Sequence, residues 1–374
     1  MGENPVKRLG EIGQSIWYDN ITRAMIQSGE LKRLIEEVGI TGVTSNPTIF
    51  QKAISGSKDY DPAIRELVRQ GIQDAKEIFL RLAMDDVSRA ADLLRPVYQR
   101  SQGMDGFVSI EVSPDLADDS EGTVAEARRI FSAIGKKNIL IKVPGTKAGL
   151  PAIEELIDEG VNVNVTLLFS IARYEEIAEA YIRGLERRAK AGKALDEVTS
   201  VASFFVSRLD SLVDPLLEAK WASARENSEK QRIKNLQGKV AVANAKLAYH
   251  RYRQIFWGER FRRLAGAKVQ RILWASTGTK NPAYRDILYV QELIGPDSIN
   301  TVPEATLRAF LDHGEAKVTV TEDLDRARAL LQDLESLGIS IDELTRRLEA
   351  EGVKAFSDSF VALLKEIQQK MGSV

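Results

Sequence analysis

The sequence alternates short strand-like runs with stretches of helical character, and this alternation limits the folds open to it. Parallel strands joined through helices are the economical way to connect such runs in one sheet. Eight runs point to a closed (β/α)8 TIM barrel, an α/β fold, in preference to an open doubly wound sheet. The runs cover residues 15–19, 42–47, 106–112, 138–143, 161–168, 198–204, 271–276 and 298–303.

Two long stretches, 53–105 and 210–268, interrupt the alternation and are helical by composition. The chain has 374 residues, whereas a barrel of this kind needs about 250. We therefore predict a barrel domain over residues 1–314 that carries both stretches as helical insertions. Residues 315–374 form an appended helical segment, which packs either on the barrel or on a partner chain.

One strand-like run carries a single charged side chain. Lys142 lies near the C-terminal end of run 138–143, which the pair Pro144-Gly145 terminates. Burial disfavours the ammonium form of a lysine, so the strand favours a free amine there. A free amine can attack a carbonyl carbon and form a Schiff base. The alternative is a buried lysine that reaches solvent or pairs with a carboxylate and has no chemical role.

Other polar side chains fall at strand ends with the same parity. Because side chains alternate along a strand, Asn162, Asn164 and Thr166 share one face, which we expect to point into the barrel. Active sites of such barrels lie at the C-terminal ends of the strands. Four more side chains are predicted there on the same basis, namely Asp19, Asn46, Glu111 and Ser276. With Lys142 they supply a nucleophile, two acids and hydrogen-bonding groups for a carbonyl substrate with several hydroxyls.

Each of these residues also allows a plain structural interpretation. Asp19 could cap a helix, Glu111 could be only the counter-ion of Lys142, and Asn46 before Pro47 could be a turn residue.

Composition narrows the range of partners. The 52 basic and 54 acidic side chains leave a net charge of -2, which gives no general field for nucleic acid or an anionic membrane. There are no cysteines, which fits a reducing compartment, and the two histidines match no metal motif. The N-terminus lacks an apolar signal region, and no run of about 18 apolar residues occurs. We expect a cytoplasmic protein with no zinc site and no membrane or nucleic-acid partner. Whether the chain forms a homo-oligomer is left open.

Taken together, the strand ends resemble those of the transaldolases over most of residues 11–313. The resemblance rests on the order and spacing of several segments, of which the first two are Ile16-Trp17-Tyr18-Asp19 and Thr44-Ser45-Asn46-Pro47-Thr48. The others are Val108-Ser109-Ile110-Glu111-Val112, Ile141-Lys142-Val143-Pro144-Gly145-Thr146, Asn164-Val165-Thr166-Leu167-Leu168-Phe169-Ser170 and Ala202-Ser203-Phe204-Phe205-Val206-Ser207-Arg208.

The resemblance implies a (β/α)8 transferase that moves a dihydroxyacetone unit from a ketose phosphate to an aldose phosphate, with no metal or organic cofactor. It assigns Lys142 as the Schiff-base lysine and Asp19 as the base for the C4 hydroxyl. Glu111 and Thr166 would handle the water of the dehydration and hydrolysis steps. The substrate-binding residues that it implies are Asn46, Asn164, Ser203, Arg208, Ser276 and Lys280.

The chain departs from many transaldolases after its seventh strand. Lys280 follows Thr277-Gly278-Thr279 where many members carry an arginine, so Lys280 is a weaker assignment than Arg208. For Arg208 the alternative is a surface ion pair with Asp210. Two other functions stay open: an aldolase that releases free dihydroxyacetone from fructose 6-phosphate, and a non-catalytic barrel that binds sugar phosphates. Aldolases of that kind tend to carry glutamine in place of Glu111.

Overall fold

A computed structural model describes residues 4–372, and in it eight parallel strands close into a barrel in the order in which they follow along the chain. Each strand pairs with the next one, and β1 pairs with β8 to complete the ring. This confirms the predicted (β/α)8 fold. The strands are β1 (Gln14–Tyr18), β2 (Gly42–Val43), β3 (Phe107–Glu111), β4 (Ile139–Pro144), β5 (Val163–Leu168), β6 (Ser200–Phe205), β7 (Arg271–Ala275) and β8 (Ser298–Val302).

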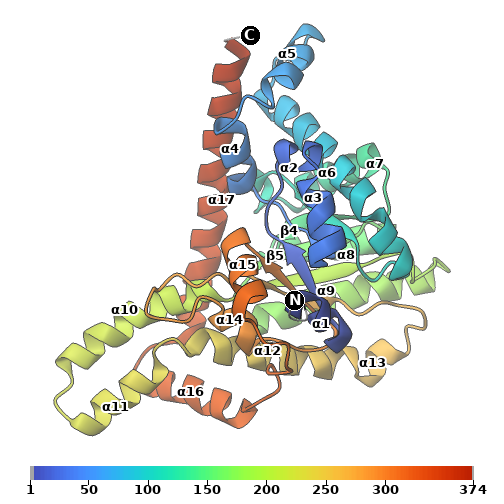
Figure 1. The fold of residues 1–374 in the computed structure, drawn as a ribbon. Helices are drawn as coiled ribbons and strands as arrows, with labels where there is room; N and C mark the ends of the chain where they lie inside the picture. The colour runs from blue at the N-terminus through green and yellow to red at the C-terminus, as the bar shows by residue number, and fades with distance from the viewer. Residues whose placement is uncertain (1–3, 373–374) are drawn as a thin grey trace.

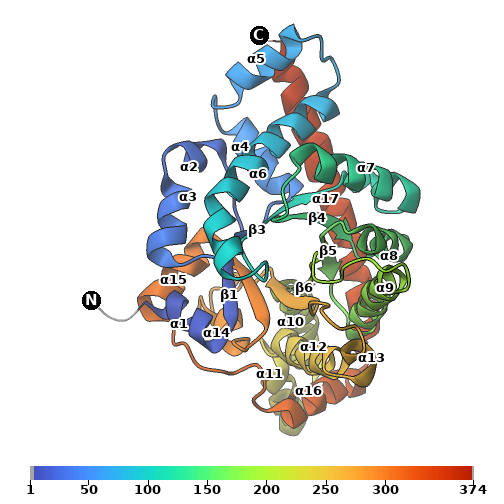
Figure 2. The same ribbon diagram turned by 90° about the vertical axis from the view of Figure 1, so that its right-hand side faces the viewer.

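Helices surround the strands, as Figure 2 shows for α6, α7, α8 and α9. In the first half they are α1 (Pro5–Ile12), α2 (Arg23–Gln27), α3 (Glu30–Arg33), η1 (Leu34–Val38), α4 (Pro47–Ser55), α5 (Asp61–Arg69), α6 (Ala75–Arg100), η2 (Pro114–Leu116), α7 (Ser120–Ile134) and α8 (Gly149–Glu159). In the second half they are α9 (Ile171–Lys190), α10 (Ser207–Ser223), α11 (Asn227–Leu236), α12 (Val240–Phe256), α13 (Glu259–Arg262), α14 (Leu288–Glu292), α15 (Glu304–His313), α16 (Leu324–Ser336) and α17 (Ile341–Gly372).

Local signals account for several of the helix ends. Ser170 caps α9 by accepting a hydrogen bond from the backbone N–H of Arg173 at 3.0 Å. Helices α7 and α8 end at Gly135 and Gly160, whose φ angles of 64° and 94° lie in the left-handed region that glycine enters without a steric penalty. These ends place β4 and β5 directly after the helices, with Lys142 on β4.

Two strands differ from their expected form. Strand β2 has only two residues, because Asn46 already caps α4 by accepting from the N–H of Ile49 at 2.9 Å. In β5 the alternation of side chains breaks near its end. Leu167 has a φ of 64°, and the register with β6 shifts between Val165 and Leu168. Two-residue alternation to the end of the strand is therefore wrong for β5, whereas run 42–47 is a strand only over its first two residues.

The C-terminal helix α17 crosses the mouth of the barrel. It contacts α4, α6, α10 and β5 and stands as the long red helix in Figure 1. A Cβ atom at Gly352 would lie 3.0 Å from Cδ2 of Leu167, so a glycine there permits the close approach of α17 to β5. Residues 1–3 of the predicted barrel domain and 373–374 of the predicted C-terminal segment lie outside the described residues.

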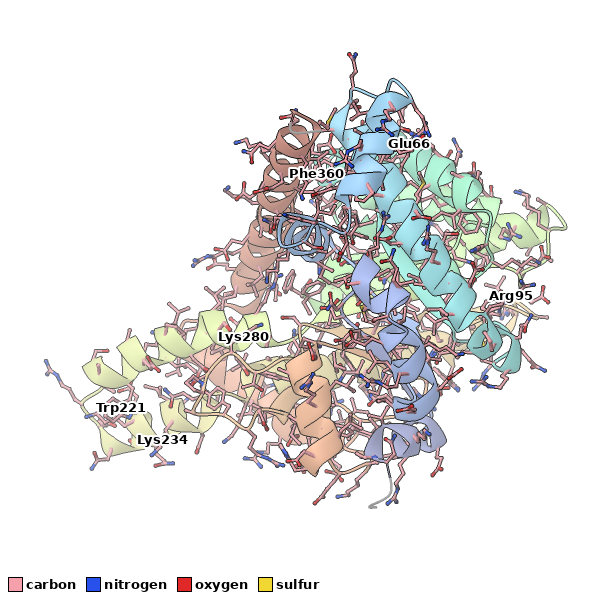
Figure 3. All side chains as sticks on the ribbon, turned by 45° about the horizontal axis from the view of Figure 1, so that its top comes forward. Glu66, Arg95, Trp221, Lys234, Lys280 and Phe360 are labelled. Atoms are coloured by element: carbon pink, nitrogen blue, oxygen red, sulfur yellow. The ribbon has the colours of Figure 1, made fainter. Side chains whose placement is uncertain are left out.

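The second predicted insertion contains α11, α12, α13 and most of α10. Helices α10 and α11 form a hairpin that extends away from the barrel, with Trp221 and Lys234 on it (Figures 1 and 3). Helix α16 packs against α12 at the base of this hairpin. Within residues 4–372, no helix combines the length and the apolar character required to cross a membrane.

Candidate active site

A cavity of about 290 Å³ opens at the C-terminal ends of the strands. Eight of the ten predicted site residues line it, and the remaining two, Glu111 and Asn164, lie directly behind lining residues. The lining residues are Asp19, Thr44, Asn46, Thr48, Ile49, Lys52, Lys142, Thr166, Ser203, Phe205, Arg208, Ala275, Ser276, Gly278, Lys280, Thr301, Pro303 and Phe356.

Lys142 stands at the inner end of the cavity and is only 5% exposed. Its Nζ donates a hydrogen bond to the carbonyl of Ser45 at 2.9 Å and lies 3.4 Å from Oε2 of Glu111. Strand register explains this pairing, since Lys142 on β4 sits opposite Glu111 on β3. The ring of Phe356 lies 5.7 Å from the same nitrogen. The amine is therefore enclosed by protein on several sides, with the Glu111 carboxylate beside it.

Asp19 follows directly after β1 and accepts a hydrogen bond from the Thr44 hydroxyl at 2.7 Å. It does not cap a helix, because Thr22 caps α2, so that interpretation is wrong. Burial raises the pKa of Asp19, while Thr44 and the charge of Lys142 act in the opposite direction. Burial likewise raises the pKa of Glu111, opposed by Lys142. Two carboxyl groups whose affinity for protons is increased thus flank one amine, which suits proton transfer.

Three hydrogen-bonded polar side chains extend inward from one wall of the cavity, and Ser203 is the one that lines it. The Ser203 hydroxyl donates to Oδ1 of Asn164 at 2.7 Å, and Nδ2 of Asn164 donates to Oγ of Ser109 at 3.0 Å. Asn164 is fully buried, so it orients Ser203 and does not itself line the cavity. Asn162 lies below this level, where its side chain bonds to Lys137, Ile139 and Thr199. The polar side chains of run 161–168 therefore lie at two levels. Asn162 bonds near the N-terminal ends of β4 and β6, whereas Asn164 lies at the level of the cavity.

Two buried oxygens near the amine have no hydrogen-bond partner among the described residues. They are Oγ1 of Thr166, which lines the cavity, and Oε1 of Glu111. Buried polar atoms are almost always paired in folded proteins. Such unpaired atoms beside a reactive amine mark a place where substrate or water can be bound.

The outer part of the cavity is basic. Arg208 on α10 lies 5.1 Å over the ring of Phe205 and has no ion pair within residues 4–372. The alternative of a pair with Asp210 is wrong, because Asp210 is buried and accepts from the Ala241 N–H and the Tyr289 hydroxyl. Lys280 lies on the loop after β7, beside α10 (Figure 3).

Sequence reasoning missed Lys52, Phe205 and Phe356 as cavity residues. Phe205 ends β6 and was within reach of the strand-end argument, because it follows Ser203 by two residues. Lys52 and Phe356 belong to α4 and α17, and no periodicity reveals that these helices border the cavity. Besides Lys142, the cations Lys52, Arg208 and Lys280 and one carboxylate line the space, so it attracts anions.

A buried lysine amine between acids, at the C-terminal end of a parallel barrel, defines the class of enzymes that form a Schiff base with a carbonyl substrate. The family model "Transaldolase/Fructose-6-phosphate aldolase" matches residues 16–367. The chain belongs to this family.

Curated relatives agree with this family over nearly the whole chain. A protein named "Transaldolase 2" from Nostoc punctiforme is 46% identical, over 99% of this chain and 98% of the relative. "Transaldolase" from Trichodesmium erythraeum is 44% identical, over 99% and 98%. "Transaldolase" from Neisseria gonorrhoeae is 46% identical, over 94% and 96%. The matches confirm the predicted family and favour a transaldolase over the two alternative functions.

Proposed function

We propose that this chain transfers a dihydroxyacetone unit between sugar phosphates, as in the pentose phosphate pathway. The donor is sedoheptulose 7-phosphate or fructose 6-phosphate, and the acceptor is glyceraldehyde 3-phosphate or erythrose 4-phosphate. The observation that carries the proposal is the Lys142 amine, 5% exposed and 3.4 Å from Glu111, at the inner end of a cavity whose outer part is basic. A ketose phosphate fits this polarity with its carbonyl inward and its phosphate outward.

The reaction begins when the Lys142 amine adds to the donor carbonyl, and loss of water leaves a Schiff base. Asp19 then takes the proton of the C4 hydroxyl as the C3–C4 bond breaks, and the aldose phosphate leaves. The three-carbon unit stays on Lys142 as an enamine. In the reverse sense the enamine attacks the acceptor aldehyde, Asp19 returns its proton, and water hydrolyses the new Schiff base to release the product.

Glu111 and Thr166 handle the water of these steps in our proposal. Supporting it are the unpaired oxygens of both side chains and the contact between Glu111 and the Lys142 amine. Glu111 accepts a proton when water attacks the Schiff base and returns it when water leaves. Burial raises the pKa of Glu111, so its carboxylate takes up a proton more readily than an exposed one does.

The remaining residues hold the substrate. Asn46 and Ser203 bind hydroxyls of the three-carbon unit, and Asn164 supports Ser203 from behind. Arg208 binds the phosphate, because its planar guanidinium suits a phosphate monoester and no ion pair occupies it within the described residues. Ser276 and Lys280 border the same outer region of the cavity.

Borohydride trapping tests the proposal. Reduction in the presence of fructose 6-phosphate should leave a stable three-carbon adduct on Lys142, seen by peptide mass spectrometry. The Lys142→Met variant should lose both the adduct and the activity while keeping its circular dichroism spectrum. A folded wild-type chain without an adduct at saturating substrate would contradict the proposal and favour a binding protein.

A second test addresses transfer against release of free dihydroxyacetone. The Glu111→Gln variant should slow transfer to an added acceptor more than it slows release. Both rates can be followed in one assay by measuring the aldose phosphate product and free dihydroxyacetone. An unchanged ratio between them would remove the role given to Glu111.

We further infer a cytoplasmic location and no nucleic-acid partner. Support comes from the absence of cysteine and from the balanced charge of 52 basic and 54 acidic residues. A homo-oligomer is compatible with this assignment, and sedimentation analysis would determine its size.

A further inference from the structure

A second hollow, larger than the catalytic cavity, lies at the base of the α10–α11 hairpin. Its volume is about 450 Å³, and it is bounded by α12, α14, α16 and the loop that follows β7. Its apolar surface comes from Val242, Ala243, Leu288, Ala327 and Leu330. None of these residues contributes to the catalytic cavity.

Basic side chains border this apolar surface, and three of them lack an internal partner. Lys239, Arg285 and Arg326 line the hollow together with the Asp323 carboxylate, and the three cations form no ion pair or side-chain hydrogen bond within residues 4–372. Most arginines of the chain are paired, as Arg232 is with Asp333. Lys246 on the same wall shows the contrast, because it is 6% exposed and bonds to Glu292 at 3.1 Å.

We propose that this hollow is a second binding site, for a small organic anion with an apolar or aromatic body. Two guanidinium groups and one ammonium supply charge-assisted donors for a phosphate or carboxylate. Val242, Leu288 and Leu330 offer the surface that the body of the ligand would cover. The volume resembles that of pockets for drug-sized ligands, about 300–1,000 Å³.

The hollow is connected to the catalytic cavity by one loop. Tyr284 lines the hollow, and its hydroxyl donates to Oδ2 of Asp214 at 2.7 Å. Oδ1 of Asp214 accepts from the backbone N–H of Gly238, another residue of the hollow, at 3.1 Å. Lys280 stands four residues before Tyr284 and lines the catalytic cavity. An anion held by Arg285 therefore restrains the loop that presents Lys280.

This connection predicts a specific effect on the proposed reaction. The bound anion should change KM for the phosphate substrates more than kcat, because Lys280 binds phosphate and takes no part in the chemistry. This step rests on the proposed function, whereas binding of the anion does not. The two are therefore measured separately.

Isothermal titration of the full chain with 1-naphthyl phosphate and with 2-naphthoate tests binding. We expect saturable binding of at least one probe, and the comparison distinguishes phosphate from carboxylate as the preferred charge. The Arg208→Ala variant, altered in the catalytic cavity, should bind the probe as the unaltered chain does. Absence of saturation by both probes, or loss of binding in Arg208→Ala, would overturn the second site.

Variants of the hollow locate the probe. Arg326→Glu should weaken binding about tenfold or more, since it removes one charge-assisted contact and adds repulsion. Leu330→Glu should weaken it similarly through the apolar surface. Arg225→Glu is the matched control, because Arg225 is exposed, has no ion pair within the described residues and lies outside the hollow. Equal affinities in Arg326→Glu, Leu330→Glu and Arg225→Glu would overturn the proposal.

The Tyr284→Phe variant tests the connection. It keeps the ring but removes the donor to Asp214, so the probe should still bind and its effect on KM should be reduced. An effect on KM that persists unchanged in Tyr284→Phe would contradict the route through this hydrogen bond. Failure of catalysis in every variant and in the unaltered chain would instead contradict the proposed function, with the binding result intact.

Discussion

Each end of the barrel holds a cluster of buried charged side chains, and the two clusters differ in how their side chains are hydrogen-bonded. At the N-terminal end, Arg271 is 8% exposed and donates to the Ser15 hydroxyl and the Ser298 carbonyl, both at 2.7 Å. Asp105 accepts from Trp17 at 2.7 Å and from Ser15. A buried cation, a carboxylate and a hydroxyl thus contact one another there.

At the C-terminal end, a buried cation and two acids are only partly occupied. Lys142 bonds to Ser45 and Glu111, but Oε1 of Glu111 and Oγ1 of Thr166 have no partner within residues 4–372. Burial raises the pKa of Asp19 and of Glu111, so their charged forms are disfavoured where they stand. Residue type alone therefore does not separate a structural cluster from a reactive one. What distinguishes the C-terminal cluster is a carboxylate oxygen that is unpaired within residues 4–372, Oε1 of Glu111, next to the Lys142 amine.

The largest effect should follow from the Asp19→Asn substitution. Loss of the proposed base should lower kcat about 10²–10⁴-fold. Because burial raises the pKa of Asp19, its ionisation disfavours the folded state, and this penalty grows as pH rises through the raised pKa. At pH 7 the variant should therefore unfold at the same urea concentration as the unaltered chain or a higher one. Unfolding at a clearly lower urea concentration would show that Asp19 stabilises the fold, as Asp105 does at the N-terminal end.

Arg271→Met should show the opposite pattern at the other end. It leaves the Ser298 carbonyl and Ser15 without their donor, which should cost about 3 kcal/mol of unfolding free energy in urea denaturation. In the folded fraction, kcat should stay within about twofold, because Arg271 is absent from the catalytic cavity. Arg232→Met is the matched control, since exposed pairs contribute about 0–1 kcal/mol. An Arg271→Met variant that kept its stability but had a low kcat would contradict the purely structural role of Arg271.

The C-terminal end of the barrel, called here the reactive end because it holds Lys142, Asp19 and Glu111, could be predicted in part from local sequence pattern. Lys142 and Glu111 stand on strands, and Asp19 directly follows one, so two-residue alternation and the order of strands suffice to bring them together. Alternation fails at Leu167, whose φ of 64° arises where β5 shifts its register against β6. Neighbouring residues in the sequence do not specify such a shift.

The cover of the cavity could not be predicted, because it depends on contacts between distant segments. Thr48 and Ser359 share a hydrogen bond of 2.9 Å although 311 residues separate them. The sequence indicates that α17 is a helix, and its leucines and phenylalanines indicate an apolar face. Packing of α17 against α4, α6, α10 and β5 determines that Phe356 meets the Lys142 amine.

Arg208→Ala should have an intermediate effect within the reactive end. Loss of a charge-assisted contact with phosphate should raise KM about 10–100-fold with a smaller change in kcat. Lys280→Ala should raise KM less, because Lys280 is exposed and its charge is screened by solvent. Arg208→Lys should restore part of the loss. Steady-state kinetics with a phosphorylated and an unphosphorylated ketose would show the difference, and equal effects on both substrates would exclude a phosphate contact.

The smallest effect concerns Thr44, which separates hydrogen bonding from charge at Asp19. The Thr44 hydroxyl donates to Asp19 at 2.7 Å and lowers a pKa that burial raises. In Thr44→Val this donor is lost, so the pKa of Asp19 should rise further. More of the base is then protonated at a given pH. The acid limb of kcat/KM should therefore move to higher pH, with activity recovering at the alkaline side.

Thr301→Val is the control for Thr44→Val. Thr301 lines the same cavity and bonds to the Thr44 hydroxyl, but it forms no hydrogen bond with Asp19 in the part of the chain that the structure describes. Its acid limb should stay in place, and Thr44→Ser should restore the position of the limb. If Thr44→Val lowered activity equally at every pH, the hydroxyl would act by holding Asp19 in place. The carboxyl group of the reactive end would then be positioned, as Asp105 is at the other end, and its pKa would not depend on this bond.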